Sequence, residues 1–187
     1  MNKDVYGDFS LAGSIFLDSR CDPNFEQRYS LIYGHNMDEH LMFGDLALYK
    51  EKEFFAQHTD GEIITINGTQ KYKVLAILQI PAGTEEVFNT DMWKGGFAHM
   101  PEYLKQASIW YHSELLELME SKSWGVQVVS LATCSSGSTN DRTVLILIRE
   151  RPDWTPTNPS ESDEPEDPGN PENPENPDTP ENPDNPE

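Results

Sequence analysis

Residues 126–148 read VQVVSLATCSSGSTNDRTVLILI, and this stretch decides the class of fold. It holds two β-rich runs, residues 126–133 and 143–148, with a loop of serine, glycine, asparagine and aspartate between them. The second run is continuously apolar, which is typical of a strand that is buried on both faces. Cys134 stands where the first run gives way to the polar loop, at one edge of the sheet that this pair predicts.

Runs elsewhere in the chain add four strands and one long helix to this pair. Asn67-Gly68 is a strong signal for a two-residue hairpin turn. Apolar residues between positions 104 and 118 recur with helical spacing, which predicts one amphipathic helix over residues 101–122. Six strands with one helical insertion indicate a mostly β, barrel-like domain. The other strands are predicted at residues 13–18, 29–35, 62–67 and 71–80, and short helices at 43–49 and 53–58.

The end of the chain differs from the rest in composition. From Pro152 on, it holds eleven of the fourteen prolines, twelve of the thirty-three acidic residues and neither Lys nor Arg. Its Asn-Pro-Glu repeats have no large apolar side chain after Trp154, so they cannot bury enough surface to offset the entropy of ordering the chain. We therefore predict a globular domain over residues 1–151 and a disordered acidic tail over residues 152–187.

The net charge of −20 excludes some classes of partner. The sequence has no basic stripe to neutralise phosphates, so a nucleic-acid partner is not expected. It has no run of about 18 apolar residues and no signal-peptide pattern, so membrane association would need a segment absent from this chain. Cys21 and Cys134 allow one disulfide at most and lack the spacing of a metal site, so no metal is expected at the cysteines.

Three residues at predicted strand ends could form a site with a cysteine nucleophile. A cysteine attacks a carbonyl as its thiolate, so Cys134 needs a base or a cation nearby. His35 ends a predicted strand, whereas the other four histidines lie in loop or helix contexts that suit solvated side chains. Arg142 opens the strand after the Cys134 loop and returns close to Cys134 if the two strands are antiparallel neighbours. Each residue alone is compatible with a structural role, but their joint placement indicates a Cys-His-Arg site.

Three motifs in this order resemble the class B sortases, a family of cysteine transpeptidases. The segment YGHNM at 33–37, followed by MFGDL at 42–46, is similar to the histidine segment of the family. The segment LATC at 131–134, with Arg142 eight residues further on, is similar to its L-x-T-C signature and downstream arginine. The block GSIFLD at 13–18 matches another recurring block, and the resemblance extends over about residues 3–150.

The resemblance implies a closed β-barrel with a helical insertion before the cysteine strand, and an acyl transfer in two steps. Cys134 would attack the threonine carbonyl of an Asn-Pro-x-Thr-x sorting motif on a surface protein and form a thioester. His35 would protonate the departing amine, and Arg142 would stabilise the oxyanion. An amine of peptidoglycan or of a pilin would then resolve the thioester, without a cofactor, at the cell surface of a Gram-positive bacterium.

The resemblance also implies residues that contact the substrate. Tyr33 matches a tyrosine of the substrate pocket, and Thr133 is the motif threonine beside the nucleophile. Val87 and Phe88 lie where the pocket wall begins the helical insertion. Ala132 stands where many members have a serine, so the exact sorting motif does not transfer with the fold.

Only about a dozen residues precede the block at 13–18, where the family has a membrane anchor, N-terminal helices and further barrel strands. We therefore expect a domain without the N-terminal strands. It would be a fragment of a longer, membrane-anchored protein, which is the favoured explanation, a domain completed by another chain, or one that is not stably folded. Two alternatives to a transpeptidase stay open. One is a cysteine hydrolase that releases its acyl-enzyme to water, and the other is a truncated, catalytically inactive sortase fold that binds peptides or wall polymer.

Overall fold

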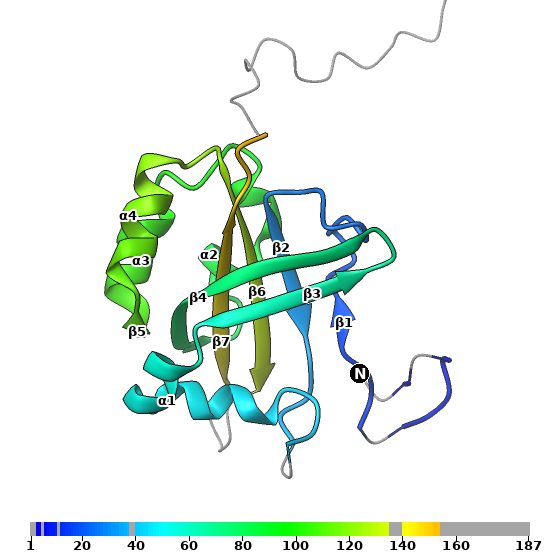
Figure 1. Ribbon diagram of the computed structural model, residues 1–187. Coiled ribbons are helices and arrows are strands. Elements are labelled where there is room, and N and C mark those ends of the chain that lie inside the picture. The colour runs from blue at the N-terminus through cyan, green and yellow to red at the C-terminus, as the bar shows by residue number, and fades with distance from the viewer. Residues whose placement is uncertain (1–2, 5, 11, 38–39, 135–139, 154–187) are drawn as a thin grey trace, which may run out of the picture. The chain divides into compact units, whose positions relative to one another are not determined.

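The computed structural model describes residues 3–4, 6–10, 12–37, 40–134 and 140–153, and for Cys134 it describes the backbone alone. Contacts divide the chain into two units, Met1–Thr155 and Pro156–Glu187. The predicted acidic tail lies outside the described residues from position 154 on. All the helices and strands named below belong to the first unit (Figure 1).

Seven strands of the first unit form one sheet (Figure 1). Their order is β1-β2-β6-β7-β4-β3, and β5 pairs with β4 beside this path. β2 and β6 run parallel, and the other pairs run antiparallel. The bounds are β1 Phe16–Leu17, β2 Tyr29–Tyr33, β3 Asp60–Thr65, β4 Gly68–Pro81, β5 Ser108–Tyr111, β6 Val126–Cys134 and β7 Asp141–Glu150.

The sheet is not closed into a barrel, so the expectation of a closed barrel is wrong for the described part of the chain. β1 and β3 form the two ends of the strand order, and within the described ranges they do not pair with each other. Closure would require every strand to have a neighbour on both sides. β1 in particular is a two-residue edge strand, held to β2 by the pairs Phe16–Tyr33 and Leu17–Ile32.

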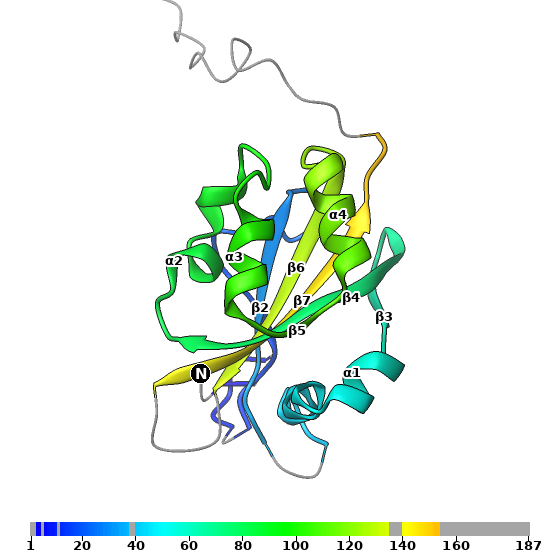
Figure 2. The same cartoon turned by 90° about the vertical axis from the view of Figure 1, so that its left-hand side faces the viewer.

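Helices cover both faces of the sheet, because the central strands carry apolar side chains toward each side. On one face lie α2, α3 and α4 (Figure 2). Their residues Val87, Leu104 and Leu116 belong to one hydrophobic cluster with side chains of the strands. On the other face, Leu46 of η1 and Phe55 of α1 belong to a second such cluster. The bounds are η1 Gly44–Lys50, α1 Lys52–Gln57, α2 Glu85–Phe88, η2 Thr90–Trp93, α3 Met100–Ala107 and α4 Ser113–Ser121. None of the described helices is long and apolar enough to cross a membrane.

The prediction of one helix over residues 101–122 is wrong, because a strand interrupts it. α3 ends at Ala107, β5 follows directly, and α4 begins at Ser113. β3 pairs with only the first six residues of β4, so the rest of that edge has backbone groups that need partners. β5 supplies them, and Tyr111 is 40% exposed as a result instead of facing the core.

The other predicted elements agree with the structure within a few residues. Residues 143–148 of β7 are all buried, as a strand covered on both faces requires. The predicted hairpin is confirmed, but its turn lies one residue earlier, at Ile66 and Asn67, since Thr65 pairs with Gly68. Gly68 has a φ of +123°, a conformation that glycine adopts at little cost. The first predicted short helix is the 3-10 helix η1.

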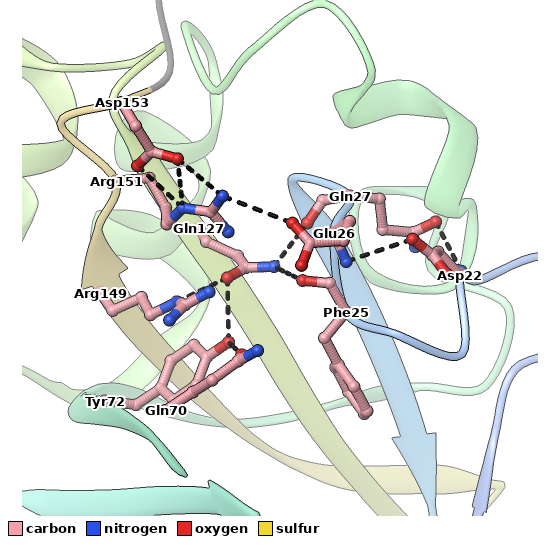
Figure 3. Close-up of polar contacts among 10 residues, drawn as sticks. All are labelled: Asp22, Phe25, Glu26, Gln27, Gln70, Tyr72, Gln127, Arg149, Arg151 and Asp153. Atoms are coloured by element: carbon pink, nitrogen blue, oxygen red, sulfur yellow. Dashed lines mark hydrogen bonds and ion pairs between the residues drawn. The ribbon is translucent and has the colours of Figure 1, made fainter. Parts of the chain in front are cut away.

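A buried amide holds together the end of the sheet where β6 begins (Figure 3). The side chain of Gln127 is fully buried, and its Nε2 donates to the carbonyl oxygens of Phe25 at 2.5 Å and Gln27 at 2.7 Å. Its Oε1 accepts from the hydroxyl of Tyr72 at 3.1 Å and from Nε of Arg149 at 2.6 Å. One side chain thus joins the loop before β2 to β4, β6 and β7.

Candidate active site

The pairing of β2, β6 and β7 brings the three residues predicted for catalysis to one edge of the sheet. Tyr33 pairs with Ala132 at the end of the parallel ladder, and Gly34 N–H still donates to the carbonyl oxygen of Ala132 at 3.1 Å. His35 follows directly, so it leaves β2 at the end of the sheet where β6 ends at Cys134. In the antiparallel ladder Cys134 pairs with Arg142. β6 and β7 are therefore the antiparallel neighbours that the return of Arg142 to Cys134 required. The side chain of Cys134 lies outside the described part of the chain.

The loop after β2 packs tightly against its own start. The backbone N–H of Phe43 donates to the carbonyl oxygen of His35 at 2.9 Å. A Cβ on Gly34 would lie 2.6 Å from the ring of Phe43, and a Cβ on Gly44 would lie 1.8 Å from the carbonyl oxygen of Met37. Only glycine therefore fits at these two positions, and the motif glycines on either side of His35 allow the loop to hold it in place.

One ring nitrogen of His35 is available, within the described part of the chain, for a further hydrogen bond. His35 is half-buried, and its Nε2 is buried without a hydrogen-bond partner among the described residues. A buried ring nitrogen of this kind can serve a bound group or a thiol, because no described side chain competes for it. His112 also has a buried Nε2 without a described partner, but its ring stacks on Phe55, with ring centroids 4.6 Å apart. The expectation that all other histidines are solvated is therefore wrong for His112.

Arg142 lies at the second position of β7, directly opposite Cys134 in the ladder. It is half-buried, and its Nη1 donates to the carbonyl oxygen of Asp141 at 3.0 Å. A guanidinium has five N–H donors, so it can keep this bond and also donate to an oxyanion. Among the described residues, no group of three or more His, Cys, Asp or Glu side chains could hold a metal ion.

Two of the predicted substrate-binding residues, Tyr33 and Phe88, contact each other. The rings of Tyr33 and Phe88 are nearly parallel, at 9°, with centroids 6.4 Å apart. Val87 is 1% exposed, and its carbonyl oxygen accepts from the hydroxyl of Tyr29 at 2.8 Å, so it contributes backbone and packing rather than an open surface. Thr133 is 3% exposed. Strand alternation places its side chain on the η1 face of the sheet, opposite the face that carries Tyr33 and Phe88.

A polar cluster beside Tyr33 was not predicted from the sequence. Asp18 is mostly buried and accepts the hydroxyl of Tyr33 at 3.2 Å. Arg20 donates to both oxygens of this carboxylate, and its Nη2 also donates to the carbonyl oxygen of Phe88 at 2.8 Å. These hydrogen bonds from Arg20 lower the pKa of Asp18 to about 2, and burial raises the pKa of Tyr33 to about 12. The available signal was the block at 13–18, which ends on Asp18.

The lowered pKa of Asp18 predicts a dependence of stability on pH. The pKa in the folded chain lies below the ordinary value of 3.8, so the charged pair stabilises the fold above about pH 4, and this contribution is lost as the pH falls toward 2. We expect Asp18→Asn to be clearly less stable than the wild type at pH 6 and much closer to it at pH 2.5. Urea unfolding at both values measures this, and equal differences at the two values would contradict it.

The contact of Gly44 with Met37 predicts a steric effect on the histidine loop. We expect Gly44→Ala to lower the free energy of unfolding by about 2 kcal/mol, because the new Cβ overlaps a backbone oxygen that cannot swing away. Gly95→Ala is the matched control, since a Cβ there meets nothing within 4 Å, and its effect should stay within about 0.5 kcal/mol. Thermal unfolding compares the two variants, and equal stability would argue against a tight loop.

Comparison with known proteins assigns the family. No family model matches the chain. A class B sortase of Streptococcus pyogenes involved in pilus biogenesis is 34% identical, with a TM-score of 0.67, over 79% of this chain and 78% of that chain. Sortase B from the type II pilus of Streptococcus pneumoniae is 25% identical, with a TM-score of 0.59, over 74% and 76% of the two chains.

A third match is limited to one segment. Sortase B of Listeria monocytogenes is 47% identical over 47 residues, which are 25% of this chain and only 19% of the length of that protein. The fold is mostly β, and β6, which ends with the LATC segment, lies inside the sheet. This fold is that of a sortase. The chain belongs to the class B sortases, because its sequence is 34% identical to the Streptococcus pyogenes enzyme over 78% of the length of that enzyme. Homology to this family supports a cysteine transpeptidase in general.

Proposed function

We propose that this chain is a cysteine transpeptidase whose nucleophile is Cys134. The observation that carries the proposal is the register of β2, β6 and β7: Cys134 pairs with Arg142, and His35 comes two residues after Tyr33, which pairs with Ala132. Directly opposed residues of an antiparallel ladder have Cα atoms about 5 Å apart, so Arg142 is within reach of a group bound at Cys134. A nucleophile, a proton carrier and a fixed cation are the groups that acyl transfer requires.

The proposed reaction has two steps. In the first, the thiolate of Cys134 attacks the carbonyl carbon of the threonine in the sorting motif and forms a C–S bond. His35 donates a proton to the departing amine as the C–N bond breaks, which leaves a thioester. Arg142 donates hydrogen bonds to the oxyanion of the tetrahedral intermediate. In the second step an incoming amine attacks the thioester, His35 accepts its proton, and the thiolate departs.

The proposed substrate is a surface protein with an Asn-Pro-x-Thr-x motif, and the acceptor is an amine of peptidoglycan or of a pilin. Two similar structures favour the pilin, since one is a sortase involved in pilus biogenesis and the other belongs to a type II pilus. We place the reaction at the surface of a Gram-positive cell, where such substrates are found. Tyr33 and Phe88 would line the peptide site, with the buried Val87 supporting them, whereas Thr133, on the other face of β6, would act only through the backbone beside Cys134.

Intact-mass spectrometry of the chain with Asn-Pro-x-Thr-x peptides tests this proposal. The expected result is a mass gain equal to the acyl part of the peptide, which disappears when an amine is added. Cys134→Ala should gain no mass. The chain contains its own control, because Cys21 is buried and its burial raises the pKa of the thiol, so no adduct is expected there.

Two other outcomes would reject the transpeptidase. An adduct that is lost to water at the same rate with and without an amine would indicate a cysteine hydrolase. If no peptide forms an adduct while Cys134 still reacts with iodoacetamide, a catalytically inactive, peptide-binding sortase fold is favoured instead.

A further inference from the structure

The aromatic wall, which consists of the stacked rings of Phe16, Tyr33 and Phe88, includes residues from two very short elements, β1 and α2. β1 has two residues and α2 has four. Such elements make few backbone hydrogen bonds of their own, so their positions depend on contacts between side chains. Tyr33 of β2 stacks on Phe16 of β1, with centroids 5.3 Å apart, and on Phe88 of α2. The shape of this wall therefore depends on what holds β1 and α2 against β2.

One ion pair connects all three elements. Nε and Nη2 of Arg20 donate to the two oxygens of Asp18, each at 2.8 Å. The same Nη2 reaches the carbonyl oxygen of Phe88, 68 residues further along the chain. The carboxylate of Asp18 also accepts from Tyr33. The side chain of Asp18 is only 10% exposed, so water competes little for its oxygens.

The charge of Asp18 determines the direction of its hydrogen bond to Tyr33. A carboxylate has no proton to donate, so the single hydroxyl proton of Tyr33 must point at Asp18. The hydroxyl oxygen then has only lone pairs left for a further partner. A peptide group that meets this oxygen must therefore be an N–H donor.

We propose that Asp18 and Arg20 are a positioning pair for the peptide site, which holds Tyr33 and Phe88 in place and presents the Tyr33 oxygen as an acceptor for an N–H group of the peptide. This inference rests on the proposed function, since it takes Tyr33 and Phe88 to line the peptide site. Neither Asp18 nor Arg20 belongs to the groups proposed for bond making and breaking. Their loss therefore affects peptide affinity and leaves the chemical step almost unchanged.

The test measures the affinity of the full chain for a fluorescent Asn-Pro-x-Thr-x peptide by anisotropy, in a Cys134→Ala background where no bond can form. Asp18→Asn and Tyr33→Phe should each raise the Kd by up to about tenfold, the upper end for one lost hydrogen bond between neutral groups. The double variant should bind no more weakly than the weaker single variant, because both changes remove the same hydrogen bond. Arg20→Lys keeps the charge but loses the two-pronged contact, and should raise the Kd less than Asp18→Asn.

Asp153→Asn is the matched control. Arg151 and Asp153 form an ion pair with the same spacing of two residues and the same two-pronged geometry, at 3.0 and 2.9 Å, near the end of the described chain (Figure 3). This pair has no contact with Tyr33 or Phe88 in the described interactions, so its loss should leave the Kd within twofold. The melting temperature of each variant is measured first, and the Kd values are then compared at a temperature at which all variants are folded.

A second measurement separates positioning from mere stability. In the active chain, Asp18→Asn should raise KM while kcat stays within twofold, whereas partial unfolding would lower kcat and leave KM unchanged. The proposal is overturned if Asp18→Asn binds like Asp153→Asn, if the effects of Asp18→Asn and Tyr33→Phe multiply, or if the parent chain binds no peptide. If the peptide binds with the expected pattern but forms no thioester with the intact cysteine, the transpeptidase fails and the positioning pair stands.

Discussion

Replacing Arg142 by alanine is expected to lower the rate of thioester formation by about 10²- to 10³-fold, the usual cost of losing one donor to an oxyanion. The register places Arg142 directly opposite Cys134, and the one hydrogen bond described for its guanidinium goes to the adjacent residue, Asp141. This bond to an adjacent residue joins no distant parts of the fold. We expect the free energy of unfolding to change by less than about 1 kcal/mol.

Arg142→Lys is the informative companion variant. Lysine keeps the positive charge but lacks the planar, five-donor fork, so it should recover only part of the lost rate. Rapid-quench mass spectrometry of the first turnover measures thioester formation, and alkylation of Cys134 by iodoacetamide checks that the thiol is still reactive. A rate for Arg142→Ala within threefold of the wild type would remove Arg142 from the catalytic groups.

Replacing Gln127 by leucine is expected to have the largest effect on stability. Leucine is close in size but leaves the carbonyl oxygens of Phe25 and Gln27, the hydroxyl of Tyr72 and Nε of Arg149 without their present partner. A buried polar group without a partner costs about 1 to 3 kcal/mol. Since Tyr72 has a second contact and Arg149 can move toward water, we expect a loss of about 4 kcal/mol in all.

Urea unfolding measures this loss against a control on the surface. Gln106 donates to Glu102 on the exposed side of α3, at 2.6 Å, so Gln106→Leu should change stability by less than about 0.5 kcal/mol. Gln127→Glu separates the two halves of the network, because it loses the donor to the two carbonyls and keeps the acceptor for Arg149. If both leucine variants unfold at the same urea concentration, the buried amide does not support the fold.

Gln127 shows that local sequence patterns predict a strand but not the hydrogen bonds that its side chains make. It stands at an alternate position of a β-rich run, where the sequence indicates a strand but gives no reason for a buried amide. Its partners come from positions 25, 27, 72 and 149, and no pattern within one strand connects them. The same limit applies to Asp18 and Arg20, whose contact with Phe88 joins parts of the chain far apart in sequence.

The sequence by itself determined most of the strands, because alternation of apolar side chains and turn residues such as Asn67-Gly68 act over a few residues. It also singled out the three residues proposed for catalysis, from their places at strand ends. The tertiary structure alone decided that β2 lies parallel to β6, so that both strands end on the same side of the sheet, and that β5 interrupts the expected helix. These features depend on which backbone edges remain unpaired once the sheet has formed, and that is settled between distant segments rather than within any one of them.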